Sequence, residues 1–174
     1  IDEAVAGALQ SKFRNSGQTC ICTNRLFVHE SVYDIFLEKF TNEVKKIKVG
    51  NGLDEGIVSG PLIDKSSLEK VIDHVQDAVN VGAKIAVGGE VHSLGGNFYQ
   101  PTVLSNVSTE AKITFEETFG PVAPVYKFSN DEEVIKMAND TPYGLASYFY
   151  SRDIGRIWRV AEALEYGIVS INNG

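Results

Sequence analysis

Apolar residues recur every three or four positions in several stretches of the chain. This spacing places them on one face of a helix, which can bury that face against a core. Residues suited to helix N-caps precede some of these stretches, as at Ser31, Asp64 and Asn130, and Gly82 and Gly167 stand where helices would end. We therefore expect helices over 4–13, 31–47, 64–81, 130–139 and 153–166.

Short runs rich in apolar and β-branched residues separate these helices, and such runs are typical of strands. Strands and helices therefore alternate along most of the chain. This alternation predicts an α/β fold with a mostly parallel sheet covered by helices. The predicted strands and extended segments are 26–28, 84–87, 98–104, 121–128, 145–150 and 168–171.

Composition and charge narrow the functional classes. The chain has 174 residues, 43% of them hydrophobic and 22% charged, which is typical of one globular domain and excludes a disordered chain. The net charge is −7 and no basic run occurs, so we expect neither a nucleic-acid partner nor a membrane partner. No apolar stretch is long enough to span a bilayer.

Other patterns argue against metal or phosphate chemistry. His29, His74 and His92 lie far apart and show no zinc-ligand spacing, so we expect no metal and place them on the surface or on helix faces. The glycine-rich segment 50–56 misses the dinucleotide-binding spacing and is expected to form a plain turn. Two cysteines cannot form a disulfide framework and indicate a reducing compartment, most simply the cytoplasm, with a mitochondrial matrix as the alternative.

Cys20 follows Gly17 in a segment expected to form a turn after the first helix. A cysteine on such a turn can be exposed, and backbone N–H groups around its sulfur would favour the nucleophilic thiolate. The alternative is a buried, inert cysteine, which is the usual state of a free thiol. The local pattern alone leaves both possibilities open.

Several short motifs stand in a fixed order along the sequence. They are Gly17-Gln18-Thr19-Cys20, Asn24-Arg25, Gly60-Pro61-Leu62-Ile63, Gly88-Gly89, Pro101-Thr102-Val103-Leu104, Glu116-Glu117-Thr118-Phe119-Gly120-Pro121 and Pro142-Tyr143-Gly144-Leu145. In this order the chain resembles the aldehyde dehydrogenase superfamily over essentially its whole length. Lys12-Phe13-Arg14-Asn15, Thr19, Tyr148-Phe149-Tyr150-Ser151 and the segment 157–162 resemble its succinate-semialdehyde dehydrogenase branch in particular.

The resemblance implies a reaction and a nucleophile. Cys20 would attack an aldehyde to form a thiohemiacetal, and hydride transfer to NAD or NADP would leave a thioester for hydrolysis. The backbone amide of Cys20 would stabilise the oxyanion. Arg14 would pair with the distal carboxylate of succinate semialdehyde, because a guanidinium matches a carboxylate. The alternative is a surface arginine favoured by the dipole at a helix C-terminus.

The resemblance also assigns cofactor contacts. Glu117 would bind the hydroxyls of the nicotinamide ribose, and Phe119 would lie beside the nicotinamide. Their alternatives are a solvated acidic pair with Glu116 and ordinary core packing of the phenylalanine. Cys22 would pack as a small apolar residue, or oxidation would join it to Cys20 as a redox partner.

The resemblance further implies that residues 1–174 form the cysteine-bearing catalytic domain of a longer protein. Most of the cofactor-binding domain, the general-base glutamate and the oligomerisation strand would lie outside this chain, which we expect to be inactive alone. The full-length protein would form a homodimer or homotetramer.

Three other functions stay open at this point. One is a related dehydrogenase acting on another acid-bearing aldehyde, such as glutarate semialdehyde. A second is a cysteine hydrolase, which needs a contact between Cys20 and a histidine. A third is a non-catalytic interaction domain, in which Cys20 would be unreactive.

Overall fold

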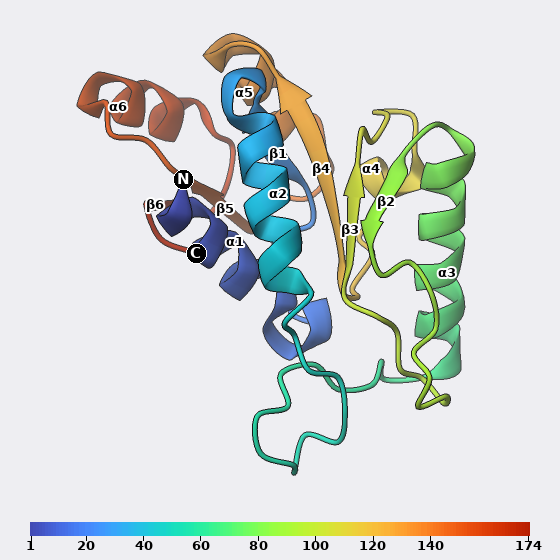
Figure 1. Ribbon diagram of the computed structural model, residues 1–174. Coiled ribbons are helices and arrows are strands. Elements are labelled where there is room, and N and C mark those ends of the chain that lie inside the picture. Colours follow the sequence, from blue (N-terminus) through green and yellow to red (C-terminus); the bar gives the residue numbers. More distant parts are fainter.

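The computed structural model describes residues 1–174 as two sheets with helices around them (Figure 1). The helices are α1 (Asp2–Phe13), α2 (Tyr33–Val44), α3 (Lys65–Asn80), α4 (Lys112–Phe115), α5 (Asp131–Asn139) and α6 (Ile154–Ala163). The strands are β1 (Leu26–His29), β2 (Lys84–Val87), β3 (Thr102–Ser105), β4 (Val122–Phe128), β5 (Ala146–Phe149) and β6 (Ile168–Ile171). Single turns of 3₁₀ helix, η1 (Arg14–Gly17) and η2 (Glu30–Val32), precede β1 and α2.

The larger sheet has the strand order β1-β4-β3-β2. β4 pairs in parallel with both β1 and β3, and only the edge strand β2 runs antiparallel to its neighbour. α1 and α2 lie on one face of this sheet and α3 on the other (Figure 1). The expected α/β architecture with a mostly parallel, helix-covered sheet is therefore confirmed.

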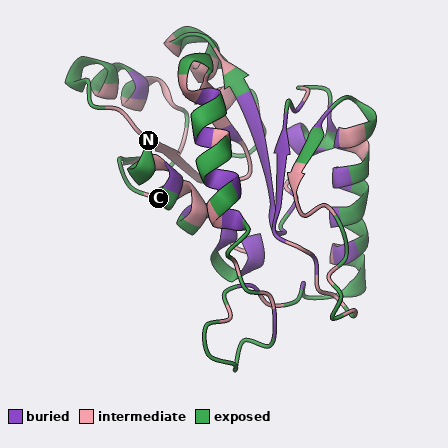
Figure 2. Cartoon of the chain, in the orientation of Figure 1, coloured by how far each residue is buried: buried purple, intermediate pink, exposed green.

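The central strands are buried on both faces because their side chains alternate between two cores. Val103 and Val125 point into the core under α1 and α2, which also contains Phe40. Leu104 and Tyr126 point into the core under α3. Figure 2 shows β3 and most of β4 as buried, and the outer faces of the helices as exposed.

A second, smaller sheet joins β5 and β6 in parallel, and it lies beside α1 in Figure 1. Arg25 connects the main sheet to α5. Its guanidinium donates hydrogen bonds to the carbonyls of Met137 (2.9 Å) and Ala138 (2.8 Å), at the C-terminal end of α5. No helix combines the length and apolarity needed to cross a bilayer.

The expected caps form in most places. The side chains of Asp64, Asn130 and Asp153 accept hydrogen bonds from backbone N–H groups in the first turns of α3, α5 and α6. The N-cap expected for α2 at Ser31 was wrong. The Ser31 N–H donates to the ring of His29 instead, and a 3₁₀ turn separates Ser31 from the start of α2 at Tyr33.

Other element boundaries also differ from expectation. Of the extended segment 98–104, only the part from Thr102 joins the sheet, and Tyr99 makes a single bridge to Val91. α2 and α6 end three residues earlier than predicted, at Val44 and Ala163. The short helix α4 has too few residues to show an apolar period, so no pattern in the sequence predicted it.

Candidate active site

The segment before Cys20 follows an unusual backbone path. After α1 ends, Asn15, Ser16 and Gly17 adopt positive φ angles of 48°, 57° and 74° in succession. Gly17 is required here, because a Cβ atom at this position would lie 2.1 Å from the carbonyl oxygen of Gly120. This close approach brings the cysteine segment against the segment that contains Glu117 and Phe119.

Cys20 lies in a turn closed by a hydrogen bond from the Cys22 N–H to the Thr19 carbonyl, at 2.8 Å. Its side chain is exposed, which is one of the two possibilities that the local sequence left open. Neither its thiol nor its backbone N–H makes a hydrogen bond within the chain. The turn therefore presents a free thiol together with a free N–H donor.

Two polar side chains fix this turn to the segment 59–63. The Gln18 amide donates to the Pro61 carbonyl (3.2 Å) and accepts from the Ile63 N–H (2.9 Å). The Ser16 hydroxyl accepts from the Gly60 N–H at 2.9 Å. The Gly-Pro-Leu-Ile motif thus supports the cysteine turn from outside.

Cys22 and Arg14 lie close together on the other side of the turn. The Cys22 thiol is partly buried and donates to the Arg14 carbonyl at 3.5 Å, and neither cysteine forms a disulfide. The Arg14 side chain is exposed, and its guanidinium forms no hydrogen bond or salt bridge within the chain. Arg14 therefore keeps all its donors available for an anion, at the C-terminal end of α1.

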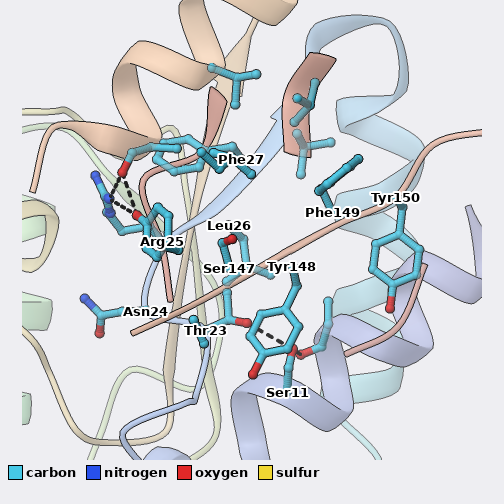
Figure 3. Close-up of a pocket in the computed structure, with 18 of the residues that line it drawn as sticks. Ser11, Thr23, Asn24, Arg25, Leu26, Phe27, Ser147, Tyr148, Phe149 and Tyr150 are labelled. Atoms are coloured by element: carbon cyan, nitrogen blue, oxygen red, sulfur yellow. Dashed lines mark hydrogen bonds between the residues drawn. The ribbon is translucent and has the colours of Figure 1, made fainter. Parts of the chain in front are cut away.

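Tyr148 of β5 contacts the cysteine turn from the small sheet. Its hydroxyl donates to the Ile21 carbonyl at 2.9 Å, next to Cys20. Partial burial raises the pKa of Tyr148, and the positive charge of Arg14 opposes that change. Figure 3 shows Tyr148 in the wall of the cavity, together with the hydrogen bond between Thr23 and Ser11 that holds the end of the cysteine turn.

Lys12 lies beneath the turn and is 1% exposed. Its ammonium group makes no hydrogen bond or salt bridge. Burial lowers its pKa from 10.5 to about 8, and the nearby Cys22 and Glu117 oppose the shift. A buried, unpaired amine is costly, so this lysine is a feature that packing alone does not explain.

Glu117 and Phe119 follow α4 on the loop 116–120. The Glu117 carboxylate is partly buried and makes no hydrogen bond, and Phe119 is 37% exposed with φ at +52°. Phe119 is therefore not a core residue. A free carboxylate can accept hydrogen bonds from two ribose hydroxyls, and an exposed aromatic ring can pack against a flat heterocycle. These two side chains fit the NAD(P) contacts that the family resemblance implies.

Asn24 connects the two segments directly. Its amide donates to the Glu116 carbonyl (3.3 Å) and accepts from the Thr118 N–H (3.2 Å). A cavity of about 720 Å³ extends from this junction toward the small sheet, with Cys20, Cys22 and Glu117 in its lining. Arg14 and Phe119 lie outside that lining, so the structure brings three of the five predicted residues to one cavity.

His74 was expected on the surface or on a helix face, and the structure places it on a buried face of α3. It is 1% exposed and contacts Thr118 and Glu116 through its ring nitrogens. His74 lies on the same face of α3 as the buried residues Val71 and Val75, and this spacing could have predicted its burial. No histidine is hydrogen-bonded to Cys20, so the contact that a cysteine hydrolase needs is missing from this chain.

The model of the aldehyde dehydrogenase family matches residues 1–174. The chain belongs to the aldehyde dehydrogenase family. A curated relative, the NADP⁺-dependent succinate-semialdehyde dehydrogenase GabD of Escherichia coli, is 55% identical over the whole chain, which covers 36% of that protein. A glutarate-semialdehyde dehydrogenase of Pseudomonas aeruginosa is also 55% identical, again with 100% of this chain and 36% of the relative covered.

A solved aldehyde dehydrogenase supports the fold. The crystal structure of succinate-semialdehyde dehydrogenase from Burkholderia pseudomallei matches with a TM-score of 0.98 and 55% identity. The match covers 99% of this chain and 36% of that one. The chain thus spans about a third of the length of these aldehyde dehydrogenases.

Proposed function

We propose that the complete protein is an NAD(P)-dependent aldehyde dehydrogenase that oxidises succinate semialdehyde to succinate, with residues 1–174 as its cysteine-bearing catalytic domain. The observation that carries this proposal is the exposed Cys20 turn, packed through Gly17 against the loop of Glu117. Hydride transfer needs the covalently held substrate to lie next to the cofactor. The nucleophile Cys20 and the cofactor-binding carboxylate of Glu117 must therefore lie close together. Family membership and the names of the relatives support the same reaction.

Cys20 carries the covalent chemistry in this proposal. Its sulfur attacks the aldehyde carbon, and the carbonyl electrons move onto the oxygen to give a thiohemiacetal anion. The Cys20 N–H, which has no partner within the chain, donates to that oxygen. The thioester left after oxidation is hydrolysed by water, which releases the carboxylic acid and restores the thiol.

Glu117 and Phe119 would hold the nicotinamide end of NAD(P). The Glu117 carboxylate would accept hydrogen bonds from the ribose hydroxyls, and the Phe119 ring would pack against the nicotinamide. When bound, the cofactor supplies the hydride acceptor. Covalent capture on Cys20 keeps the substrate carbon in place during the transfer.

Arg14 would bind the distal carboxylate of the substrate. Its guanidinium is exposed and unpaired, and it lies within electrostatic reach of Tyr148, which also borders Cys20. A planar fork of donors recognises a carboxylate better than an ammonium group does. The glutarate-semialdehyde dehydrogenase at equal identity makes glutarate semialdehyde the second candidate substrate.

Steady-state kinetics of the complete protein test this proposal. Succinic semialdehyde, glutaric semialdehyde and uncharged butyraldehyde would each be assayed with NAD and with NADP. We expect the carboxylated aldehydes to have kcat/KM at least about a hundredfold higher, with most of that preference lost in Arg14→Ala. Arg152→Ala, which removes another exposed arginine, is the matched control. Equal turnover of charged and uncharged aldehydes would contradict the semialdehyde assignment.

Cys22 would act as a redox partner of Cys20. Hydrogen peroxide would accept two electrons and two protons from the two thiols, which would join as a disulfide while peroxide becomes water. We expect peroxide to remove activity and both free thiols, and a dithiol reductant to restore them. A Cys22→Ala variant that is inactivated as reversibly as the wild type would count against this role.

A further inference from the structure

His74 lies on the side of α3 that faces the loop 116–120. Its ring is almost completely buried, and both of its nitrogens contact this one loop. Nδ1 lies 3.1 Å from the Thr118 hydroxyl oxygen, and Nε2 lies 3.2 Å from a Glu116 carboxylate oxygen. These two residues flank Glu117 in the sequence, so the histidine contacts a side chain on each side of it.

The charges around the ring indicate which nitrogen carries the proton. Burial lowers the pKa of His74, while the hydrogen bond to Glu116 opposes this shift. Lys70 disfavours the protonated ring, and Asp73 favours it. In the neutral ring, Nε2–H donates to the Glu116 carboxylate, which can only accept when ionised, and Nδ1 accepts from the Thr118 hydroxyl.

The loop needs such support because of Phe119. Its φ of +52° is rare for a bulky residue, and such a conformation persists only where the surroundings fix it. Asn24 holds the loop from the cysteine side, through the Glu116 carbonyl and the Thr118 N–H. His74 holds it from the opposite element, α3.

We propose that His74 is a positioning residue that fixes the loop 116–120 and so presents Glu117 and Phe119 to NAD(P). The second half of this statement rests on the proposed function of these two residues. The first half does not, because it concerns only contacts within the chain. Neither the sequence motifs nor the expected role of any histidine pointed to this contact.

Three variants of the complete protein separate the two hydrogen bonds. His74→Phe keeps a ring and removes both bonds. His74→Asn keeps an amide near the Nδ1 position, and His74→Gln keeps one near the Nε2 position. Ala78→Gly, one turn further along α3 and equally buried, is the control for a general loss of helix stability.

Hydrogen exchange, cofactor affinity and the KM for the aldehyde together test the proposal. In the cofactor-free protein, amide hydrogen exchange of peptides covering 116–120 should be about tenfold faster in His74→Phe and unchanged in Ala78→Gly. Calorimetric titration with NAD and NADP should show a Kd about fivefold weaker or more in His74→Phe, with partial rescue in the Asn or Gln variant. The KM for the aldehyde should stay unchanged.

The outcomes remain distinguishable. Unchanged exchange of this loop in His74→Phe would overturn the proposal, whatever happens to the cofactor. Faster exchange with an unchanged cofactor Kd would overturn the link between the loop and NAD(P). A wild-type protein that binds neither cofactor would instead contradict the proposed function, and the exchange data would still decide whether His74 fixes the loop.

Discussion

At the scale of single residues, Lys12, next to the Cys20 turn, lowers the stability of the fold. Its pKa falls from 10.5 to about 8 because burial disfavours the charged amine. This difference corresponds to about 3 kcal/mol of lost stability at pH 7. Lys12→Met keeps a similar shape without a charge, so we expect it to raise the free energy of unfolding by about 2–3 kcal/mol at pH 7.

The pH dependence of this gain distinguishes a charge effect from better packing. Between pH 8 and 10.5 the unfolded chain keeps the lysine proton that the native protein has released, so wild-type stability rises with pH in that window. The advantage of Lys12→Met should therefore shrink from pH 7 to 9.5 in urea titrations of the complete protein. Lys45→Met, at an exposed position, should show no such trend. A constant advantage at all pH values would contradict the buried-charge explanation.

At the scale of elements, Arg25 joins α5 to the main sheet. It donates to two carbonyls at the end of α5 and lies 5.3 Å from the centre of the Phe27 ring. Arg25→Met removes charge-assisted hydrogen bonds to partly buried carbonyls, so we expect the free energy of unfolding to fall by about 2 kcal/mol. The thermal midpoint should fall accordingly and hydrogen exchange should accelerate within Asp131–Asn139. Arg152→Met, at an exposed position without a partner, should change neither.

Local patterns predicted the elements well where one apolar face or one cap decides the structure, as for Asp64 at the start of α3. They failed where a distant or competing contact decides. Ser31 is suited to an N-cap, but its N–H is bound by His29. At the site, the local sequence left the exposure of Cys20 open. The hydrogen bonds of Asn24 and His74 to the loop 116–120 join segments far apart in sequence, so no local pattern could predict them.

At the scale of the whole molecule, the chain contains only part of the chemistry it would need. In the proposed reaction Cys20 would supply the nucleophile and its own N–H, and Glu117 lies in the same cavity. Hydrolysis of a thioester also needs a base that activates water, and no carboxylate is hydrogen-bonded to the cysteine turn.

We therefore expect the 174-residue chain, expressed alone, to reduce neither NAD nor NADP with succinic semialdehyde. Its circular dichroism should still show helices and strands, and iodoacetamide at neutral pH should alkylate Cys20, because the turn that exposes the thiol is formed within the chain. The complete protein, assayed in parallel, is the control for the substrate and the cofactor. Cofactor reduction by the isolated chain would show that a base within it suffices, and Glu117, which lines the same cavity, would be the first residue to replace.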